Sequence, residues 1–406
     1  MIRISVRELG EVVTGHTPPT SKREYYGDSV PFLKPTDMVV GQKYTYFTEE
    51  GYSDLAVAKY KGSLIPKGAT CVVCIGTLGE KMSMAHCNLF TNQSINSIIP
   101  NKKYDQHYVY YLLKHNLHRV KALNKGTASG REFVSKSMFL DLEIDVIEDV
   151  LQQKKIAQVL SAYDDLIENN QKQIKLLEEA AQRLYKEWFV NLRFPGHENV
   201  KIIDGVPEGW EKKNLGSLIE VVRGRSYSSD ELSETGGVLM VNLSNIRPFG
   251  GYNRAQEKHY NGKYTQEQTV KSYDLIMGLT DMTQERRTVG RVAIVPELRK
   301  KAIISMDLIK LVPKEGSSLF FYALLSFGGY SEVISRFANG TNVLHLRPDV
   351  LDVVDVLSPP KVLQENYSDF FKKILNKIND LEDQILLAIE ARDRLLPKLM
   401  SGEIEL

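Results

Sequence analysis

Two long stretches of the chain carry apolar residues at alternating spacings of four and three, which is typical of a helix with one narrow apolar face. The first stretch runs from Ile156 to Trp188 and the second from Tyr367 to Leu399. A narrow stripe suits a partner helix better than a broad domain surface, so we predict that the two helices pair as a coiled coil. The predicted seam consists of Ile156, Leu160, Tyr163, Ile167, Asn170, Ile174, Leu177 and Leu184 in the first helix and Phe371, Ile374, Ile378, Leu381, Ile385 and Leu395 in the second.

Both helices are predicted to be rods of about 45 Å, because some 30 residues rise by about 1.5 Å each. Asn170 is a polar residue inside the apolar stripe and would fix the register of the pair. Pro397 is predicted to end the second helix near Leu396, since proline lacks the amide hydrogen that a helix needs. The alternative is that each helix packs only on the globular region of its own half of the chain.

The chain also repeats itself, with an offset that drifts between 206 and 214 residues. Thr14-Gly15 recurs as Arg223-Gly224, residues 33–38 align with 241–246, and Lys125-Gly126-Thr127 matches Asn339-Gly340-Thr341. The two helical stripes repeat at an offset of 211. Each match is weak alone, but all of them occur in the same order, so we predict a duplicated architecture.

A region of mixed pattern precedes each helix. β-Branched runs at 70–73 and 291–295 predict strands, and helical segments follow near 106–120 and 318–335. The predicted fold class is α/β, of the α+β type: two similar globular domains separated by two long antiparallel coiled-coil helices, related by a pseudo-twofold internal repeat. The predicted segments are a globular domain at 1–149, a helix at 150–190, a linker at 191–209, a second globular domain at 210–358, and a helix with the C-terminal tail at 359–406.

Composition narrows the class of protein. The 406 residues are 42% hydrophobic and 25% charged, as in ordinary globular domains. No apolar run is long enough for a membrane span, and the first residues lack an apolar signal core, so we expect a cytoplasmic protein without a membrane partner. A net charge of +1 does not indicate nucleic acid, although basic residues cluster at 119–136 and 286–301.

Cysteine and histidine leave one metal hypothesis open. Cys71 and Cys74 form a CxxC pair, followed by His86 and Cys87, which is conceivable as a zinc site. We favour a buried strand over residues 71–75, in which positions three apart face opposite sides. We therefore expect no metal.

Signatures of catalysis are absent. The sequence contains no GxxxxGK[ST] phosphate loop and no HExxH or GxSxG motif. Ser358-Pro359-Pro360-Lys361 approaches the motif of amino-methyltransferases, but Lys361 stands where an aromatic residue would stack on the target base. A repeated architecture without a repeated catalytic constellation indicates a binding protein, with no catalytic residue and no cofactor of its own.

Over essentially its whole length the chain resembles the DNA specificity (S) subunits of type I restriction–modification systems. The resemblance rests on the duplicated order and on several motifs. These are residues 31–38, 91–96, 181–189 followed by Phe194-Pro195-Gly196, 206–210 and 395–404.

This resemblance implies that each globular domain is a target recognition domain that reads one half of a split sequence in double-stranded DNA. It implies that the helices act as a spacer and dock two methyltransferase (modification) subunits, and that restriction subunits complete an ATP-dependent endonuclease. S-adenosylmethionine, ATP and Mg are then expected in the partner subunits. Half-sites on one face of a duplex lie about 34–36 Å apart, which a rod of about 45 Å can span.

Loop position, charge and the internal repeat select candidate DNA-binding residues. The alternative for each residue is a structural role in a turn, since turns also favour Asn, Gly, Ser and Thr. The candidates are His16, Thr17, Lys34, Thr36, Lys125, Thr127, Ser129 and Arg131 in the first half and Arg223, Arg225, Tyr227, Asn242, Ser244, Asn339, Thr341, Asn342 and His345 in the second.

Two other functions remain open on the sequence. One is a non-catalytic protein-binding adaptor with duplicated domains, which the near-zero net charge allows. The other is a stand-alone DNA-modifying enzyme. Binding through several phosphates weakens steeply with salt, so salt dependence separates DNA binding from protein binding.

Overall fold

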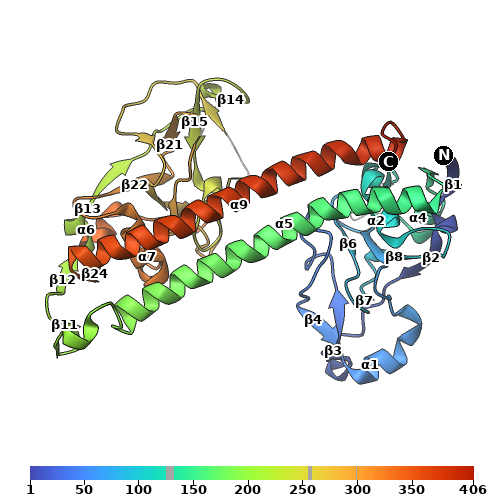
Figure 1. Ribbon diagram of the computed structural model, residues 1–406, viewed down its shortest axis with the longest axis horizontal. Helices are drawn as coiled ribbons and strands as arrows, with labels where there is room; N and C mark the ends of the chain where they lie inside the picture. The colour runs from blue at the N-terminus through green and yellow to red at the C-terminus, as the bar shows by residue number, and fades with distance from the viewer. Residues whose placement is uncertain (125–131, 255–257, 299) are drawn as a thin grey trace. The chain divides into compact units, whose positions relative to one another are not determined.

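The computed structural model describes residues 1–124, 132–254, 258–298 and 300–406 (Figure 1). The candidates Lys125, Thr127, Ser129 and Arg131 lie outside these residues. The chain divides into two compact units, which we call unit 1 (Met1–Gln171 with Asp383–Leu406) and unit 2 (Lys172–Glu382). Each unit therefore holds one globular part and half of each long helix, a grouping that differs from the five segments proposed above.

Unit 1 contains a four-stranded antiparallel sheet in the order β2-β8-β5-β6 and a three-stranded sheet in the order β4-β3-β7, in which β3 and β7 are parallel. A further pair, β1 with β9, closes the globular part just before the first long helix. The strands are β1 (Ile2–Ser5), β2 (Gly10–Thr14), β3 (Tyr26–Leu33), β4 (Glu50–Tyr52), β5 (Thr70–Val73), β6 (Met82–Met84), β7 (Phe90–Thr91), β8 (Ile95–Pro100) and β9 (Glu143–Val146). The short helices are α1 (Asp54–Lys59), α2 (Gln106–His115), α3 (Leu117–Ala122) and α4 (Lys136–Leu140).

Unit 2 contains a four-stranded antiparallel sheet in the order β13-β22-β18-β20 and a five-stranded sheet in the order β14-β16-β15-β21-β17, in which β15 and β21 are parallel. The main strands are β12 (Glu211–Asn214), β13 (Ile219–Arg223), β14 (Leu232–Ser233), β15 (Val238–Val241), β16 (His259–Tyr260), β17 (Thr269–Val270), β18 (Leu275–Gly278), β20 (Val292–Ile294), β21 (Ala302–Ile304), β22 (Leu308–Pro313) and β24 (Asp355–Ser358). The remaining strands described in unit 2 are β10 (Ile202–Ile203), β11 (Val206–Pro207), β19 (Thr280–Asp281) and β23 (Leu344–His345), each two residues long. The short helices are α6 (Leu215–Leu218), α7 (Ser318–Phe327) and α8 (Tyr330–Ser335).

The two units repeat one topology. The sheet β2-β8-β5-β6 corresponds strand by strand to β13-β22-β18-β20, and the parallel pair β3/β7 corresponds to β15/β21. The closing pair β1/β9 has its counterpart in β12/β24, and the helices α2 and α3 have theirs in α7 and α8. The duplicated, mixed helix-and-strand fold predicted from the sequence is confirmed.

The long helices are α5 (Val150–Tyr185), followed by a single π-turn at Lys186–Val190, and α9 (Lys361–Ser401). In unit 1 the two helices run antiparallel, because Asp164 contacts Arg392 and Asn170 contacts Gln384 (Figure 1). In unit 2 the Tyr367 hydroxyl, near the start of α9, donates to the carbonyl of Ala181, near the end of α5, at 3.1 Å. The predicted pairing of the helices is therefore confirmed.

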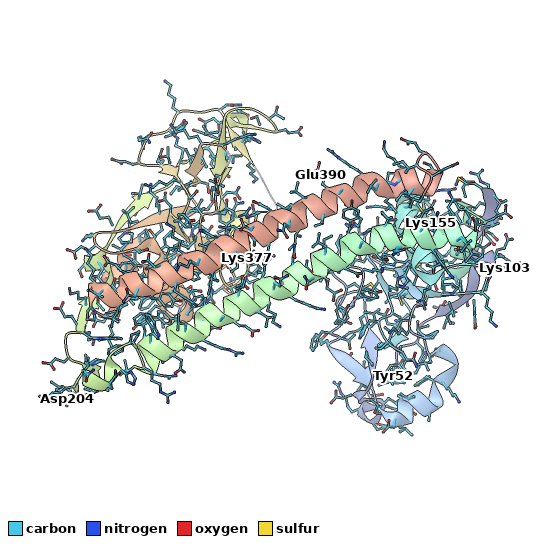
Figure 2. All side chains as sticks on the ribbon, viewed as in Figure 1. Tyr52, Lys103, Lys155, Asp204, Lys377 and Glu390 are labelled. Carbon is cyan, nitrogen blue, oxygen red and sulfur yellow. The ribbon has the colours of Figure 1, made fainter. Side chains whose placement is uncertain are left out.

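Both helices also bury side chains in the globular part of unit 1. Ile156 and Leu160 of α5 and Leu399 of α9 belong to the same apolar cluster as Tyr108 and Ile144. The Lys155 ammonium, on α5 in Figure 2, donates to the carbonyl of Leu406 at 3.0 Å and so fastens the end of the chain to the start of α5. The alternative of helices that pack only on their own globular region is wrong, because each helix contacts its partner as well.

The seam positions differ in how deeply they are buried. Asn170 is only 2% exposed, and its amide donates to the Gln384 side chain at 3.0 Å. The buried apolar seam residues are Ile156, Leu160, Ile167, Ile174, Phe371, Ile374, Ile378 and Leu381. The half-buried seam residues are Tyr163, Leu177, Leu184, Ile385 and Leu395.

Pro397 does not end α9, contrary to the sequence prediction. The helix continues to Ser401 with the proline inside it. Proline removes one helical hydrogen bond, but Leu396, Leu399 and Met400 around it are almost completely buried in the core of unit 1. The burial of these side chains offsets the lost bond, since each contributes roughly 1.5–3 kcal/mol.

A buried ion pair interrupts the apolar seam in unit 1, and the sequence pattern did not reveal it. Asp164 and Arg392 lie 2.5 Å apart with side chains that are 5% and 4% exposed. The Tyr111 hydroxyl also donates to Asp164, and Lys43 donates to Ser161 one turn earlier on α5. Although burial disfavours its charge, hydrogen bonds from Arg392 to Asp393 and Asp164 hold the pKa of the guanidinium above its ordinary value. At the 211-residue offset, the matching positions are Leu375 and Ala181, so the repeat does not duplicate this pair.

We predict that Asp164→Ala lowers the stability of the chain by about 3–5 kcal/mol, because it leaves the Arg392 guanidinium buried without its carboxylate. Asp164→Leu combined with Arg392→Met removes both charges and should restore most of that loss. The midpoint of urea unfolding, followed by circular dichroism, measures both effects. An unchanged midpoint in the single variant, or a double variant as unstable as the single one, would contradict this account of the seam.

Candidate nucleic-acid interface

The carboxyl ends of the two parallel strands gather three loops in unit 1. The strands β3 and β7 end side by side at Leu33 and Thr91. The chain leaving β2 crosses these ends, where the His16 amide donates to the Thr91 carbonyl at 2.8 Å and the Gly15 amide donates to the Ile95 carbonyl at 3.2 Å. Residues 15–17, 34–37 and 91–94 therefore lie together, although they are far apart in the sequence. We call this arrangement the crossing of unit 1.

Unit 2 builds the same crossing with the same main-chain bonds. The Arg225 amide donates to the Ile304 carbonyl at 2.8 Å, and the Gly224 amide donates to the Leu308 carbonyl at 3.2 Å. The Ser305 amide bonds to Val241 as the Asn92 amide bonds to Leu33. Arg225 therefore occupies the position of His16, and Asn242 occupies that of Lys34.

A glycine makes each crossing feasible. A Cβ atom on Gly15 would lie 2.1 Å from the Thr91 carbonyl oxygen, and a Cβ atom on Gly224 would lie 1.9 Å from that of Ser305. Both obstacles are main-chain atoms, so no side-chain rotation relieves them. The pairing of Thr14-Gly15 with Arg223-Gly224 in the sequence reflects this shared steric constraint.

Gly15→Ala should destabilise the chain by about 1–3 kcal/mol, because the added methyl group must push β7 and the loop 15–17 apart. Gly62→Ala is the matched control in unit 1, since a Cβ atom at Gly62 meets nothing within 4 Å. Urea unfolding of both variants checks the prediction. Equal midpoints for the two variants would show that the crossing tolerates a side chain.

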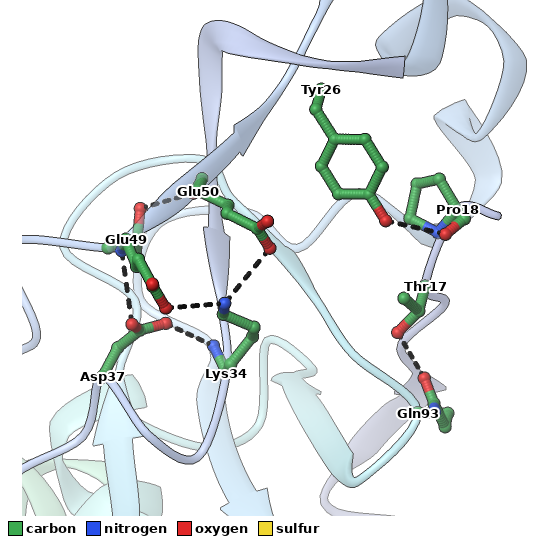
Figure 3. Close-up of polar contacts among 9 residues, drawn as sticks. Thr17, Pro18, Tyr26, Lys34, Asp37, Glu49, Glu50 and Gln93 are labelled. Carbon is green, nitrogen blue, oxygen red and sulfur yellow. Dashed lines mark hydrogen bonds and ion pairs between the residues drawn. The ribbon is translucent and has the colours of Figure 1, made fainter. Parts of the chain in front are cut away.

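Several polar side chains lie at the crossing in unit 1 and contact one another (Figure 3). The Lys34 ammonium lies 3.0 Å from Glu49 and 3.1 Å from Glu50, while the Asp37 carboxylate accepts the Lys34 amide at 2.7 Å. Burial opposes the charge on Lys34, but hydrogen bonds to the two glutamates raise its pKa above the ordinary value. Lys34 therefore keeps its charge, and two carboxylates compete with any external anion for it.

The remaining candidates of unit 1 differ in accessibility. His16 is exposed, with its ring 4.6 Å from that of Tyr60, and Thr36 is exposed as well. The Thr17 hydroxyl bonds to the side chain of Gln93 (Figure 3). Gln93 is exposed beside these residues and was missed as a candidate, although it lies within the motif at 91–96. That motif was the signal that could have selected it.

In unit 2 the corresponding candidates divide into accessible and internal side chains. Arg223 is exposed, Tyr227 is half-buried, and the Arg225 guanidinium donates to the Tyr260 hydroxyl at 3.2 Å. Asn242 is only 5% exposed, and its side chain accepts the amide of Ser244 at 3.0 Å. The structure therefore shows that Asn242 and Ser244 stabilise a turn, which is the structural alternative to DNA binding.

The loop at 339–345 reaches the same region of unit 2. Strand β23 pairs with β19, which places His345 opposite Thr280. The Thr280 hydroxyl donates to Asp307 at 3.1 Å, and Asp307 follows the end of β21. The candidates Asn339, Thr341, Asn342 and His345 are all exposed.

The CxxC pair lies elsewhere. Cys71 belongs to β5 and Cys74 follows it, both buried among apolar side chains. Burial raises the pKa of the Cys71 thiol to about 12 and that of Cys74 to about 11, so both stay protonated. Within the residues that the structure describes, no His, Cys, Asp or Glu side chains gather in a group of three that could hold a metal ion. None of the described helices is both long and apolar enough to span a bilayer.

Fold and main-chain bonds together define a chain with two loop crossings of common design. Residues 3–179 and 207–391 match the family described as "Type I restriction modification DNA specificity domain". The chain belongs to this family.

Two relatives from Methanocaldococcus jannaschii are similar over most of the chain. The MjaIX specificity subunit of a type I restriction enzyme is 28% identical over 98% of this chain and 92% of its own length. The MjaVIII specificity subunit is 24% identical over 93% of this chain and 91% of its own length. The crystal structure of a type I restriction–modification S subunit from M. genitalium has the same fold, with a TM-score of 0.63, 17% identity, and coverage of 98% of this chain and 96% of that one.

Proposed function

We propose that this chain is the DNA-recognition subunit of a type I restriction–modification complex and that each unit reads one half of a bipartite site in double-stranded DNA. The observation that carries the proposal is the duplicated crossing, in which identical main-chain bonds present different side chains. His16, Lys34 and Gln93 in unit 1 stand where unit 2 has Arg225, Asn242 and Met306. One scaffold with two sets of side chains suits a subunit that recognises two different half-sites.

The chemistry of the exposed side chains supports DNA as the ligand. Arginine pairs bidentately with guanine, and asparagine and glutamine pair with adenine in the major groove. Arg223, Asn339, Asn342 and Gln93 are exposed representatives of these types. Lysine and arginine contacts to phosphates would position the duplex, while the amides and guanidinium groups would specify bases.

We also propose that the long helices dock two methyltransferase subunits and set the separation of the two half-sites. Leu151 and Leu176 on α5 are 70% and 64% exposed. At the 211-residue offset they correspond to Val362 and Leu387 on α9, which are 64% and 61% exposed. Two copies of the same pair of exposed apolar positions fit two copies of one partner, since large apolar side chains in water favour a protein interface.

Catalysis belongs to the partners in this proposal. Methyltransferase subunits would bind S-adenosylmethionine, and restriction subunits would bind ATP and magnesium. The chain itself would contribute DNA recognition and no catalytic group.

The complex of this chain with its methyltransferase subunits should select, from a library of randomised DNA duplexes, two short conserved sequences separated by a fixed number of unspecified base pairs. Binding to the selected duplex should fall steeply as salt rises, because several phosphates release counterions. Sequencing of the selected duplexes and titrations at several salt concentrations measure both. Selection of a single uninterrupted motif, or of none, would overturn the proposal, and binding indifferent to salt would favour the protein-binding adaptor.

The repeat supplies matched variants for that selection. His16→Ala should alter base preference in one half-site only, and Arg225→Ala in the other half-site only, because the two residues hold equivalent positions in different units. A change of both half-sites by either variant would contradict separate reading.

Leu176→Asp and Leu387→Asp should each weaken the assembly with methyltransferase subunits by about tenfold or more, since a carboxylate would be desolvated at an apolar contact. Gln171→Asp, at an exposed polar position of α5, introduces the same charge and is the control. Analytical ultracentrifugation of the mixed subunits gives the stoichiometry. Full assembly of both leucine variants would place the docking surface elsewhere.

A further inference from the structure

The connection between β18 and β20 is a basic loop that lies outside the duplicated crossing. It spans residues 279–291, whereas the equivalent connection in unit 1, between β5 and β6, spans only residues 74–81. The equivalence is fixed by main-chain bonds, because the Leu279 amide donates to the Asp307 carbonyl as the Cys74 amide donates to that of Ser94. Unit 2 therefore carries an insertion at this point, and Arg286, Arg287 and Arg291 lie within it.

One buried carboxylate organises the insertion. Asp281 is 2% exposed, and its two oxygens accept bonds from both flanks of the loop. The Oδ1 atom accepts hydrogen bonds from the amide and the hydroxyl of Thr283, each at 2.7 Å. The Oδ2 atom accepts the amide of Thr288 at 2.6 Å and the amide of Val289 at 3.4 Å. Burial opposes the charge on this carboxylate, but these hydrogen bonds outweigh it and hold its pKa below the ordinary value. Asp281 therefore acts as an ionised clamp at the base of the loop.

One contact from a neighbouring segment and one from within the loop hold its main chain as well. The Phe249 amide donates to the Arg287 carbonyl at 2.7 Å, and the Arg291 guanidinium donates to the Arg286 carbonyl at 3.1 Å. Arg286 has a φ of 53°, a left-handed conformation that a residue with a side chain adopts only when its surroundings impose it. A backbone fixed at these points presents the two adjacent arginine side chains in a defined direction.

The loop also joins the candidate DNA-binding residues of unit 2. Gln284 donates to the Thr341 carbonyl at 2.9 Å, and the strand that ends at Asp281 pairs with the strand that contains His345. Arg287 is exposed and forms an ion pair with Glu285 at 2.5 Å. The Nε atom of Arg286 is buried, and among the described residues it has no hydrogen-bond partner. The loop that carries Arg286 and Arg287 is thus bonded to the segment that carries Asn339 and Asn342.

We propose that residues 281–291 form a base-reading loop of unit 2, in which Arg286 and Arg287 contact the edges of base pairs in the DNA duplex and Asp281 is the positioning residue that fixes their geometry. This inference rests on the proposed DNA-recognition function and extends it to a segment outside the duplicated crossing. Unit 1 has Gly76 where unit 2 has Asp281, so the device belongs to one half-site only. Guanine is the expected base, because its O6 and N7 atoms accept both donors of a guanidinium.

The test compares the motifs that variants of the full complex select from randomised duplexes. Asp281→Asn keeps the size of the side chain but replaces an acceptor oxygen with a donor that faces the Thr288 or Thr283 amide, so the loop should lose its fixed geometry. We expect Asp281→Asn and Arg286→Ala each to reduce discrimination by about tenfold or more at one or two positions of a single half-site. The other half-site should keep its full base preference.

Asp274→Asn is the matched control. Asp274 lies at the opposite end of β18 and also accepts a main-chain amide, that of Lys271 at 3.0 Å. This variant should select the wild-type motif. A variant that merely lowers the folded fraction changes the amount of DNA bound but not the bases selected, so the motif separates positioning from folding.

Each outcome bears on the inference. Loss of discrimination confined to one half-site supports it. Unchanged motifs for both Asp281→Asn and Arg286→Ala overturn it, as do changes in both half-sites or a uniform loss of affinity without a change of motif, which would mean phosphate contact alone. Failure of the wild-type complex to select any bipartite motif is a different result, because it overturns the proposed function itself.

Discussion

The antiparallel packing of α9 against α5 is the interaction on which both units depend. Residues near the end of α9 complete the apolar core of unit 1. Leu396, Leu399 and Met400 are buried in the same cluster as Tyr108, Phe139 and Ile144. Unit 2 takes the end of α5 from the first half, where Tyr185 and Phe189 pack on Tyr367. Neither half of the sequence alone therefore contains a complete core.

Polar groups inside the helix seam give this packing its specificity. Two helices that repeat at a constant offset present similar apolar stripes, so apolar burial alone distinguishes alternative pairings poorly. Asp164 with Arg392 and Asn170 with Gln384 are satisfied only when α5 meets α9 in the observed register. Any shifted pairing would leave a buried charge without its partner, at a cost of several kcal/mol. The apolar residues supply most of the stability, and these pairs select the register.

Periodicity and repetition allowed much of the fold to be predicted from the sequence. The 4–3 spacing revealed both long helices, and the shared order of weak matches revealed the duplication. Two errors at the seam have physical causes. Asp164 sits one position away from the Tyr163 assigned to the stripe, and its burial depends on Arg392, which is distant in the sequence. Pro397 stays in the helix because the core of unit 1 surrounds its last turn.

The candidate recognition site could be predicted only in part, because side-chain accessibility depends on long-range contacts. Loop position selected the exposed His16, Thr36 and Arg223, and the same reasoning selected Asn242, whose polar groups are engaged within its own turn. Asp281 resembles any other carboxylate in the sequence. Its role emerges only when the structure brings Thr283, Thr288 and Val289 around it.

The crossing at the parallel strands is held together by main-chain atoms, and this separates the requirements of folding from those of recognition. The bonds of Gly15, His16 and Asn92, like those of Gly224, Arg225 and Ser305, use amides and carbonyls that every residue type except proline can supply. Only the two glycines are sterically required, because a Cβ atom would meet a carbonyl oxygen. The side chains at the other positions are therefore free to differ without loss of the fold. That freedom explains how two units with the same strand order carry different polar groups at His16 and Arg225, and why a loop such as 279–291 can be longer in one unit than in the other.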